Sequence, residues 1–409
     1  MQVRIQASGG LLGWPEPGCR CASCQRARAA GTARGPFSAI VDRVLRVEGP
    51  RVVPVAASGE DKGGDKGPAG GWAEGAAREL GGYQVRRLPG GWDVSAPDGG
   101  RLLCADGSGA APAVPPGTRR YDVALLDLLG DPAQLGRLRG QGAVTPGTVV
   151  AMVFADHRVS SERELRRRGH IWRLEVPRDG DLVRAPAPAG GQRAGGERAL
   201  PYRVVVLGGA RSGKSAEAEM RVAAEPAVTY VATAAAPAPG ADPEWAMRIA
   251  AHRSRRPPWW RTVETTDLPG VLRQARGTVL VDSVTAWLAA VMDECGAWDG
   301  AAAPASRVGE RIAELVGVWR QASAYLVAVS DETGLGVVPE TPAGRMFRDE
   351  LGRLNQALAA ESEELAVVVA GQATTISGPD FPCGSLRRPL RCRNDTGVRT
   401  PPRLARYGR

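Results

Sequence analysis

Eight consecutive residues with the sequence GGARSGKS fit the pattern G-x-x-x-x-G-K-[ST]. In such a loop successive backbone N–H groups turn inward around phosphate oxygens, and the N-terminus of the following helix adds partial positive charge. The strand-like run RVVVL at 203–207 precedes the octet, and good helix formers follow it. The sequence therefore predicts a nucleoside triphosphate site, the alternative being a glycine-rich turn without a ligand. The expected nucleotide-binding residues are Gly208, Gly209, Ala210, Arg211, Ser212, Gly213, Lys214 and Ser215.

Two of these positions and one distant acid have expected roles in phosphoryl chemistry. Lys214, the only lysine after residue 66, would reach the terminal phosphates as a catalytic residue, and Ser215 would hold Mg²⁺. Asp282 ends the apolar run TVLVD, where a second Mg²⁺ ligand is expected. The alternative for Asp282 is that it caps the next helix.

A single histidine falls in the same half of the chain as this loop. The three histidines are His157, His170 and His252. An imidazole can attack phosphorus at neutral pH and leave again, because its ordinary pKa is near 6.5. Arginines at 253, 255 and 256 flank His252 and would offset phosphate charge. A purely structural histidine is the alternative.

Three cysteines near the N-terminus have the spacing of a metal site. Cys19, Cys21 and Cys24 form C-x-C-x-x-C, and thiolates this close converge on a soft cation. The alternative is three reduced cysteines without a ligand. The chain has seven cysteines, and this odd number argues against a disulfide framework.

The elements that must position these residues are clearest in the second half. Apolar runs without alternation are typical of strands covered on both faces, and helical stretches at 216–224 and 306–322 separate them. Strands alternating with helices predict a doubly wound, mainly parallel sheet. The expected strands are 203–207, 227–233, 278–282, 324–330 and 365–370.

The first half is expected to be a separate α/β domain. Strands are expected at 2–6, 121–126 and 149–154, with a helix at 160–168 capped by Ser160 or Ser161. The glycine- and proline-rich stretch 56–117 is not placed. Pro and Gly at 185–196 (APAPAGGQRAGG) mark a boundary. We expect a domain at 1–184, a linker at 185–200, a phosphate-loop domain at 201–376 and a disordered basic tail at 377–409.

The charge balance argues against a nucleic-acid partner. The 409 residues include 53 Lys+Arg and 44 Asp+Glu, a net charge of +9. Residues 378–409 hold eight Arg and two Asp, so +6 lies in the tail and the rest is nearly neutral. We find no apolar run of membrane-spanning length and no signal-peptide pattern, so a cytoplasmic protein is expected.

Five segments together resemble the bifunctional adenosylcobinamide kinase / adenosylcobinamide-phosphate guanylyltransferase family, over about 203–376. They are GGARSGKS, YVATA at 230–234, RIAAHRSRRPPWWRTVE at 248–264, VDSVTAWL at 281–288 and GLGVVPETPAGRMFRDELGRLNQ at 334–356. The resemblance implies a first step in which ATP or GTP phosphorylates the aminopropanol hydroxyl of adenosylcobinamide. It implies a second step in which GMP passes from GTP to a histidine and then to the new phosphate.

The same resemblance implies residue roles. His252 matches the guanylylated nucleophile, and Arg345, Arg348 and Asp349 fall in a segment expected at the substrate or a subunit boundary. Mg²⁺ with GTP or ATP and a homo-oligomer are also implied, in a pathway of cobalamin biosynthesis. The family commonly shows Asn where this chain has Asp331, and the added negative charge bears on rate or nucleotide preference.

The cysteine segment resembles the opening of a metallo-β-lactamase-fold branch that includes cyclic-phosphate phosphodiesterases. That resemblance implies a structural zinc held by Cys19, Cys21, Cys24 and a late histidine, here His157. The catalytic H-x-H-x-D-H cluster of that superfamily cannot exist where the only histidines are 157 and 170. A degenerate domain that keeps its zinc is expected.

Two other classes of function compete with the cobinamide enzyme. A generic phosphate-loop ATPase or GTPase with a regulatory role would have no use for His252. A nucleic-acid-binding protein is disfavoured by the balanced charge outside the tail.

Overall fold

Two β-sheets make up the first half of the chain. The computed structural model describes residues 1–55, 72–185, 198, 200–234, 247, 253–299 and 302–378, with the backbone alone at 302–304. One sheet is antiparallel, in the order β11-β1-β2-β3-β4, and comprises β1 (Gln2–Ala7), β2 (Ser38–Val41), β3 (Leu45–Glu48), β4 (Arg51–Pro54) and β11 (Leu182–Arg184). The other, in the order β10-β9-β8-β7-β6-β5, comprises β5 (Ala77–Leu80), β6 (Tyr83–Leu88), β7 (Gly91–Ser95), β8 (Arg101–Ala105), β9 (Val123–Leu126) and β10 (Val149–Met152).

The second of these sheets is apolar on both faces. Val94 and Leu102 pack with Val3 and Ile5 of β1 in a core shared by the two sheets. On its other face, residues such as Met152 pack with α1 (Ala22–Ala30), α2 (Ala133–Gly140) and α3 (Glu162–Trp172). The expected strands at 2–6, 121–126 and 149–154 and the helix at 160–168 are confirmed, with Ser161 as the cap of α3.

The second half is built on one seven-stranded sheet, in the order β14-β13-β15-β16-β12-β17-β18. All its neighbouring strands pair in parallel except β17 and β18. The strands are β12 (Tyr202–Gly208), β13 (Val228–Ala232), β14 (Arg261–Glu264), β15 (Thr278–Asp282), β16 (Tyr325–Asp331), β17 (Glu364–Val369) and β18 (Gln372–Ser377). The predicted parallel sheet is confirmed, and β14 and β18 extend it at its edges.

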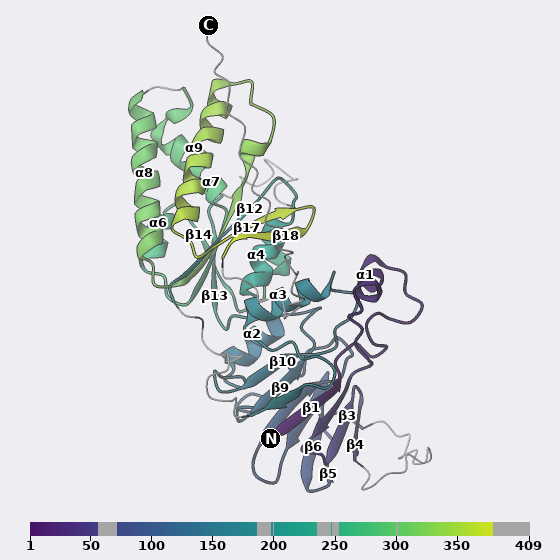
Figure 1. Ribbon diagram of the computed structural model, residues 1–409. Coiled ribbons are helices and arrows are strands. Elements are labelled where there is room, and N and C mark those ends of the chain that lie inside the picture. The colour runs from purple at the N-terminus through teal and green to yellow at the C-terminus, as the bar shows by residue number, and fades with distance from the viewer. Residues whose placement is uncertain are drawn as a thin grey trace, which may run out of the picture. The chain divides into compact units, whose positions relative to one another are not determined.

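Helices cover both faces of this sheet (Figure 1). They are α4 (Lys214–Val222), α6 (Leu268–Arg273), α7 (Val284–Cys295), α8 (Ala302–Gln321) and α9 (Pro342–Ala360), with the short 3-10 helices η1 (Ala297–Asp299) and η2 (Thr333–Leu335). Val204 and Val206 of β12 face α4, whereas Val205 and Leu207 face the core formed with α6 to α9. Burial on both faces explains why the strand sequences are apolar without alternation.

Helix α4 also contacts the first half of the chain. Arg167 of α3 pairs with Glu217 at 2.6 Å, and the Trp172 indole donates to the carbonyl of Met220 at 2.9 Å. Ala224, just after α4, belongs to the same apolar cluster as α2 and α3. One face of α4, the helix that follows the glycine-rich octet, therefore packs against the N-terminal half.

The proposed domain limits remain predictions. Each sheet is formed by strands from one side of the expected linker at 185–200, most of which lies outside the described residues. The expected basic tail, from residue 379 onward, lies outside them as well. None of the described helices combines the length and the apolar character that crossing a membrane requires.

Candidate functional site

The glycine-rich octet connects β12 to α4 as a tight loop. Gly213 has a φ of 98°, and Gly371 N–H donates to the carbonyl of Ser212 at 2.8 Å. A Cβ on Gly208 would lie 2.4 Å from Ser212 Oγ and 2.7 Å from the carbonyl of Val368, so no side chain fits there. The loop of the sequence pattern is thus present at the carboxyl end of a central parallel strand, where such folds bind ligands.

The cationic group of this loop is Lys214. Its Nζ donates to the carbonyl of Gly209 at 3.2 Å and lies 2.7 Å from Asp331 Oδ1. Ser212 Oγ is buried and lacks a hydrogen-bond partner among the described residues. An anionic ligand such as a phosphate is favoured here, because the Lys214 ammonium, the Ser212 hydroxyl and the N-terminus of α4 can all interact with it.

The two expected Mg²⁺ ligands lie together. Ser215 Oγ donates to Asp282 Oδ1 at 3.4 Å, and Tyr230 OH donates to Asp282 Oδ2 at 2.7 Å. Burial, followed by the Asp282 charge, raises the pKa of Tyr230, so its hydroxyl stays protonated as a donor. Ser283 caps α7 through its hydroxyl, which removes the alternative that Asp282 is that cap.

The arginine-rich segment lies beside the same helix. Arg255 pairs with Glu219 of α4 at 2.9 Å, and this hydrogen bond raises the pKa of Arg255. The Arg256 guanidinium lies 3.3 Å from the centroid of the Tyr230 ring, a cation–π contact. His252 itself, with the preceding segment 248–251, lies outside the described residues.

Helix α9 presents the other predicted substrate residues. Arg348 and Asp349 pair with each other at 3.1 Å and line an open cavity of about 670 Å³. Arg345 instead donates to the backbone carbonyls of Pro339 and Glu340, at 3.0 and 2.6 Å. It is not among the residues that line the cavity.

Sequence reasoning missed Asn355, which links the cavity to the end of β16. Asn355 is buried, lines the cavity, and donates from Nδ2 to the carbonyl of Asp331 at 3.0 Å. Ser330 donates to Asn355 Oδ1 at 2.7 Å. The sequence feature that could have revealed Asn355 is its amide side chain within the apolar face of a helix, next to Leu354 and Leu358.

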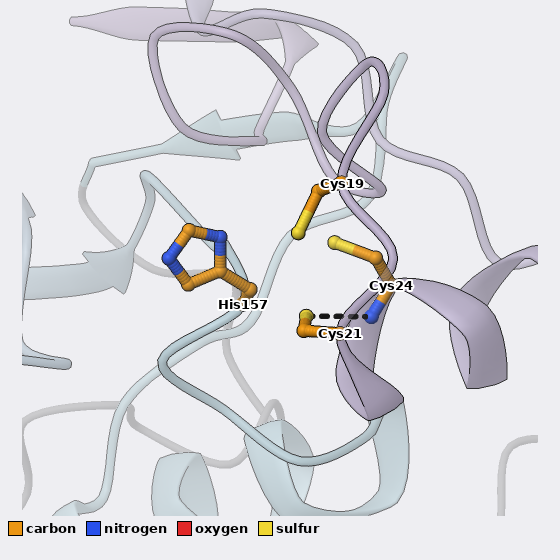
Figure 2. A group of neighbouring side chains, drawn as sticks. All are labelled: Cys19, Cys21, Cys24 and His157. Atoms are coloured by element: carbon orange, nitrogen blue, oxygen red, sulfur yellow. Dashed lines mark hydrogen bonds between the residues drawn. The ribbon is translucent and has the colours of Figure 1, made fainter.

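The four expected zinc ligands come together in the first half (Figure 2). Sulfur or nitrogen atoms of Cys19, Cys21, Cys24 and His157 all lie within 4.8 Å of one another. A hydrogen bond from Cys24 N–H lowers the pKa of Cys21 to about 7, whereas burial raises the pKa of Cys24 to about 11. Glu16 borders the cluster, 2.9 Å from His157 Nδ1.

Three thiols and an imidazole are a donor set that suits zinc in a closed structural site. The cluster is assembled from two separate segments, the turn that leads into α1 together with the first turn of that helix, and the loop before α3. Ser23 of α1 also donates to the carbonyl of Val159 in that loop at 2.5 Å, and Arg26 donates to Ser160. Protein contacts therefore already hold the two segments side by side.

A pair of carboxylates near the cluster is neutralised by an arginine. Arg158 pairs with Asp127 at 2.8 Å and with Asp156 at 2.9 Å. Asp127 follows β9 and is buried, and burial raises its pKa despite the guanidinium. Both acids are therefore paired with the same guanidinium.

Comparison with known proteins finds likeness in the second half of the chain. Residues 204–376 match the model of a family described as cobinamide kinase / cobinamide phosphate guanyltransferase. The chain is 42% identical over 184 residues to the bifunctional adenosylcobalamin biosynthesis protein CobP of Pseudomonas aeruginosa, covering 43% of this chain and 98% of that protein. It is 36% identical over 178 residues to CobU of Escherichia coli, with 41% and 96% covered. A solved structure of Zn²⁺-bound PqqB from Methylobacterium extorquens aligns with 45% of this chain and all of that one, at 16% identity and a TM-score of 0.28.

Proposed function

The chain belongs to the cobinamide kinase / cobinamide phosphate guanyltransferase family, and from that premise we propose a two-step activity for residues 201–376. First, the terminal phosphoryl group of ATP or GTP moves to the hydroxyl of adenosylcobinamide. GMP then moves from GTP through His252 to the phosphate just formed, giving adenosylcobinamide-GDP. The observation that carries the proposal is the meeting of Lys214, Ser215 and Asp282 at one edge of the sheet.

The phosphate loop supports the kinase step. Backbone N–H groups at the start of α4 and the Lys214 ammonium would bind the β- and γ-phosphates. Ser215 and Asp282 would hold Mg²⁺, since two oxygen ligands 3.4 Å apart suit a small hard cation. When bound, Mg²⁺ neutralises charge on the phosphate oxygens. Tyr230 fixes the second oxygen of Asp282 and so orients the carboxylate.

His252 is proposed as the nucleophile of the second step. Its nitrogen would attack the α-phosphorus of GTP, and pyrophosphate would leave with the electrons of the broken P–O bond. An oxygen of cobinamide phosphate would then displace the histidine. Support comes from the residues that follow it, because Arg255 is tied to Glu219 of the phosphate-loop helix.

The cavity along α9 is proposed to receive the acceptor. It opens beside Leu207, at the end of the strand that carries the loop, and extends past Arg348 and Asp349. A guanidinium and a carboxylate on one wall suit an acceptor rich in amide groups. Arg345 would stabilise the conformation of the turn at 339–340 by donating hydrogen bonds to its two carbonyl groups.

The first half is proposed to be a degenerate metallo-β-lactamase-like domain, 1–184, with a structural zinc at Cys19, Cys21, Cys24 and His157. The donor set and its close spacing support the zinc. We also propose that 185–200 is a linker and that 377–409 is a basic tail. The proposal further includes a homo-oligomeric assembly and a cytoplasmic location.

Labelled GTP tests the two-step activity directly. Full-length protein incubated with GTP labelled at the α-phosphate should acquire an acid-labile, base-stable label, as expected for a phosphoramidate. H252A should acquire none yet still transfer γ-label from ATP or GTP to adenosylcobinamide. Label on H252A would contradict the nucleophile, and a generic ATPase would show neither adduct nor transfer.

A further inference from the structure

The lysine of the phosphate loop already has an anionic partner in this structure. Asp331 Oδ1 lies 2.7 Å from Lys214 Nζ, and the side chains are 26% and 12% exposed, respectively. Asp331 is the last residue of β16 and pairs in register with Gly208, the first residue of the octet. The ammonium group that would bind the terminal phosphates is therefore neutralised by a carboxylate while the loop is empty.

The backbone of Asp331 is fixed from both sides. Its N–H donates to Thr285 Oγ1 at 2.8 Å, and its carbonyl accepts from Asn355 Nδ2 at 3.0 Å. Asn355 in turn accepts from the buried Ser330 at 2.7 Å. Because the strand end is held in this way, the carboxylate stays beside the loop when a ligand binds, and the ligand must meet its charge.

Glu332 offers a comparison at the next position. Its Oε1 accepts a hydrogen bond from Gly334 N–H at 3.0 Å, which directs the carboxylate to its own turn. Among the residues that the structure describes, the ion pair of Lys214 is with Asp331 and not with Glu332. Two neighbouring acids thus carry the same charge, and one of them contacts the phosphate-binding group.

The distance from Lys214 brings the Asp331 charge close to a bound nucleotide. Lys214 would contact a terminal phosphate oxygen at about 2.8 Å, so Asp331 Oδ1 falls within about 5.5 Å of that oxygen. Two negative charges this close repel each other strongly at a partly buried site. A divalent cation bound to the phosphates offsets about half of the charge of a nucleoside triphosphate and so weakens this repulsion.

We propose that Asp331 makes the phosphate loop selective for metal-bound nucleotide. A metal-free triphosphate has to compete with the carboxylate for Lys214 and then remain beside it. A nucleotide that carries Mg²⁺ meets less repulsion, so its affinity is reduced less. The inference rests on the proposed phosphate-loop function and adds to it the residue that sets this selectivity.

An amide at this position would remove the selectivity and leave the chemistry in place. Asn, which the family commonly shows where this chain has Asp331, carries no charge to neutralise Lys214 or to repel a phosphate. Phosphoryl transfer therefore does not need the carboxylate. What the acid adds is a penalty on one form of the nucleotide, and D331N removes that penalty with little change of shape.

The test measures binding of labelled GTP to full-length proteins, without acceptor, by equilibrium dialysis at matched ionic strength. Each protein is measured once with excess Mg²⁺ and once with EDTA, and thermal melts confirm folding. The variants are D331N, D331E, which keeps the charge, and E332Q, which removes an equal charge that does not contact Lys214.

We expect D331N to bind metal-free GTP about 10–100-fold more tightly than wild type, the scale of one charge pair at this distance. Its affinity for GTP with Mg²⁺ should rise by only about 3–10-fold, because halving the charge halves the repulsion energy. The preference for the metal-bound form should therefore narrow in D331N. In D331E and E332Q it should stay within about threefold of the wild-type preference.

Three results would overturn the inference. D331N may show the wild-type preference, it may bind GTP more weakly in Mg²⁺, as a residue that only positions Lys214 or ligates the metal would require, or E332Q may narrow the preference equally. A wild-type protein that binds GTP in neither condition would instead contradict the phosphate-loop site itself, which is a distinguishable result.

Discussion

Ser215 donates a hydrogen bond to Asp282 across 3.4 Å, joining the first turn of α4 to the end of β15. These residues are 67 positions apart in sequence and come from two parallel strand–helix units. The contact brings a hydroxyl and a carboxylate to the edge where Lys214 lies. It is the geometry from which the metal dependence of the enzyme should follow.

Asp282→Asn should weaken use of Mg²⁺. Loss of the carboxylate charge should raise the Mg²⁺ concentration needed for half-maximal phosphoryl transfer by more than about 10-fold, since altering a residue that only orients a metal ligand already costs about 10–100-fold. Tyr230→Phe removes only the hydrogen bond that orients Asp282 and should have a smaller effect. Equal Mg²⁺ requirements for D282N and wild type would show that Asp282 is not a metal ligand.

Lys214→Arg should be nearly as inactive as Lys214→Ala. The compact ammonium fits between the Gly209 carbonyl and Asp331, whereas a planar guanidinium does not match that space. Both variants should lose about 10²–10³-fold in kcat, comparable to removing one preorganised donor from a transition state. The measurement is γ-label transfer, and substantial activity in K214R would contradict the assigned geometry.

Gly208→Ala should destabilise the protein, and Gly209→Ala is its matched control. The added methyl at 208 meets Ser212 Oγ and the Val368 carbonyl, whereas at 209 nothing lies within 4 Å. Overpacking of this kind costs about 1–3 kcal/mol of unfolding free energy. In thermal or urea unfolding, the free energy of unfolding should therefore be clearly lower for G208A than for G209A. Equal values would mean that the loop relaxes around the added methyl group.

Alkylation of the metal-free cluster should depend on pH in a defined order. The lowered pKa of Cys21, about 7, means that its reactive thiolate forms as the pH rises through neutrality. Cys24, with a raised pKa of about 11 and a buried side chain, should stay unreacted there. Mass spectrometry after timed iodoacetamide treatment reads both sites, and added zinc should protect Cys21. Reaction of Cys24 before Cys21 at pH 7.5 would contradict this order.

Glu217→Gln should lower the free energy of unfolding by more than a comparable substitution at the protein surface. Glu217 pairs with Arg167 at 2.6 Å and with Arg221 at 2.8 Å, and Arg221 is 1% exposed. Arg167 keeps Glu164 and Arg221 keeps Glu364, so the loss should be about 1.5–3 kcal/mol, as for a hydrogen bond to a charged group, rather than that of an unpaired buried charge. Glu294→Gln, which breaks a partly exposed pair with Arg311, should cost less than about 1 kcal/mol. Urea unfolding compares the two variants, and similar losses would show that the buried network contributes little.

Much of the second half could be predicted because local sequence and tertiary environment agree there. The expected strands at 203–207 and 278–282 match β12 and β15 within one residue at each end, since their apolar runs are buried on both faces. Strands β14 and β18 were missed because they lie at the sheet edges, where exposed Arg and Gln side chains break the apolar pattern. Strands β5 to β8 were hidden by glycine-rich turns between short runs.

The site residues also divide into those that the sequence could predict and those that it could not. The phosphate loop could be predicted because glycines and Lys214 have fixed spacing, and the cysteine cluster because three of its members are neighbours in sequence. The contact between Lys214 and Asp331 could not, since it depends on β16 lying directly beside β12. Asn355 was likewise hidden, because its role comes from a strand 24 residues away in sequence.

The packing of α3 against α4 has a consequence for how this enzyme can be divided. The curated relatives align with about 180 residues of this chain and are themselves almost fully covered, so their counterparts of α4 have no equivalent of this neighbour within the aligned length. Here Met220 and Ala224 pack with the N-terminal half, and a methyl on Gly136 would lie 2.7 Å from the carbonyl of Ala223. Without the first half, the apolar side chains of Met220 and Ala224 would be exposed to solvent, and Glu217 would lose Arg167 while keeping Arg221. The second half of this chain is therefore expected to depend for its stability on a surface that the shorter relatives do not need.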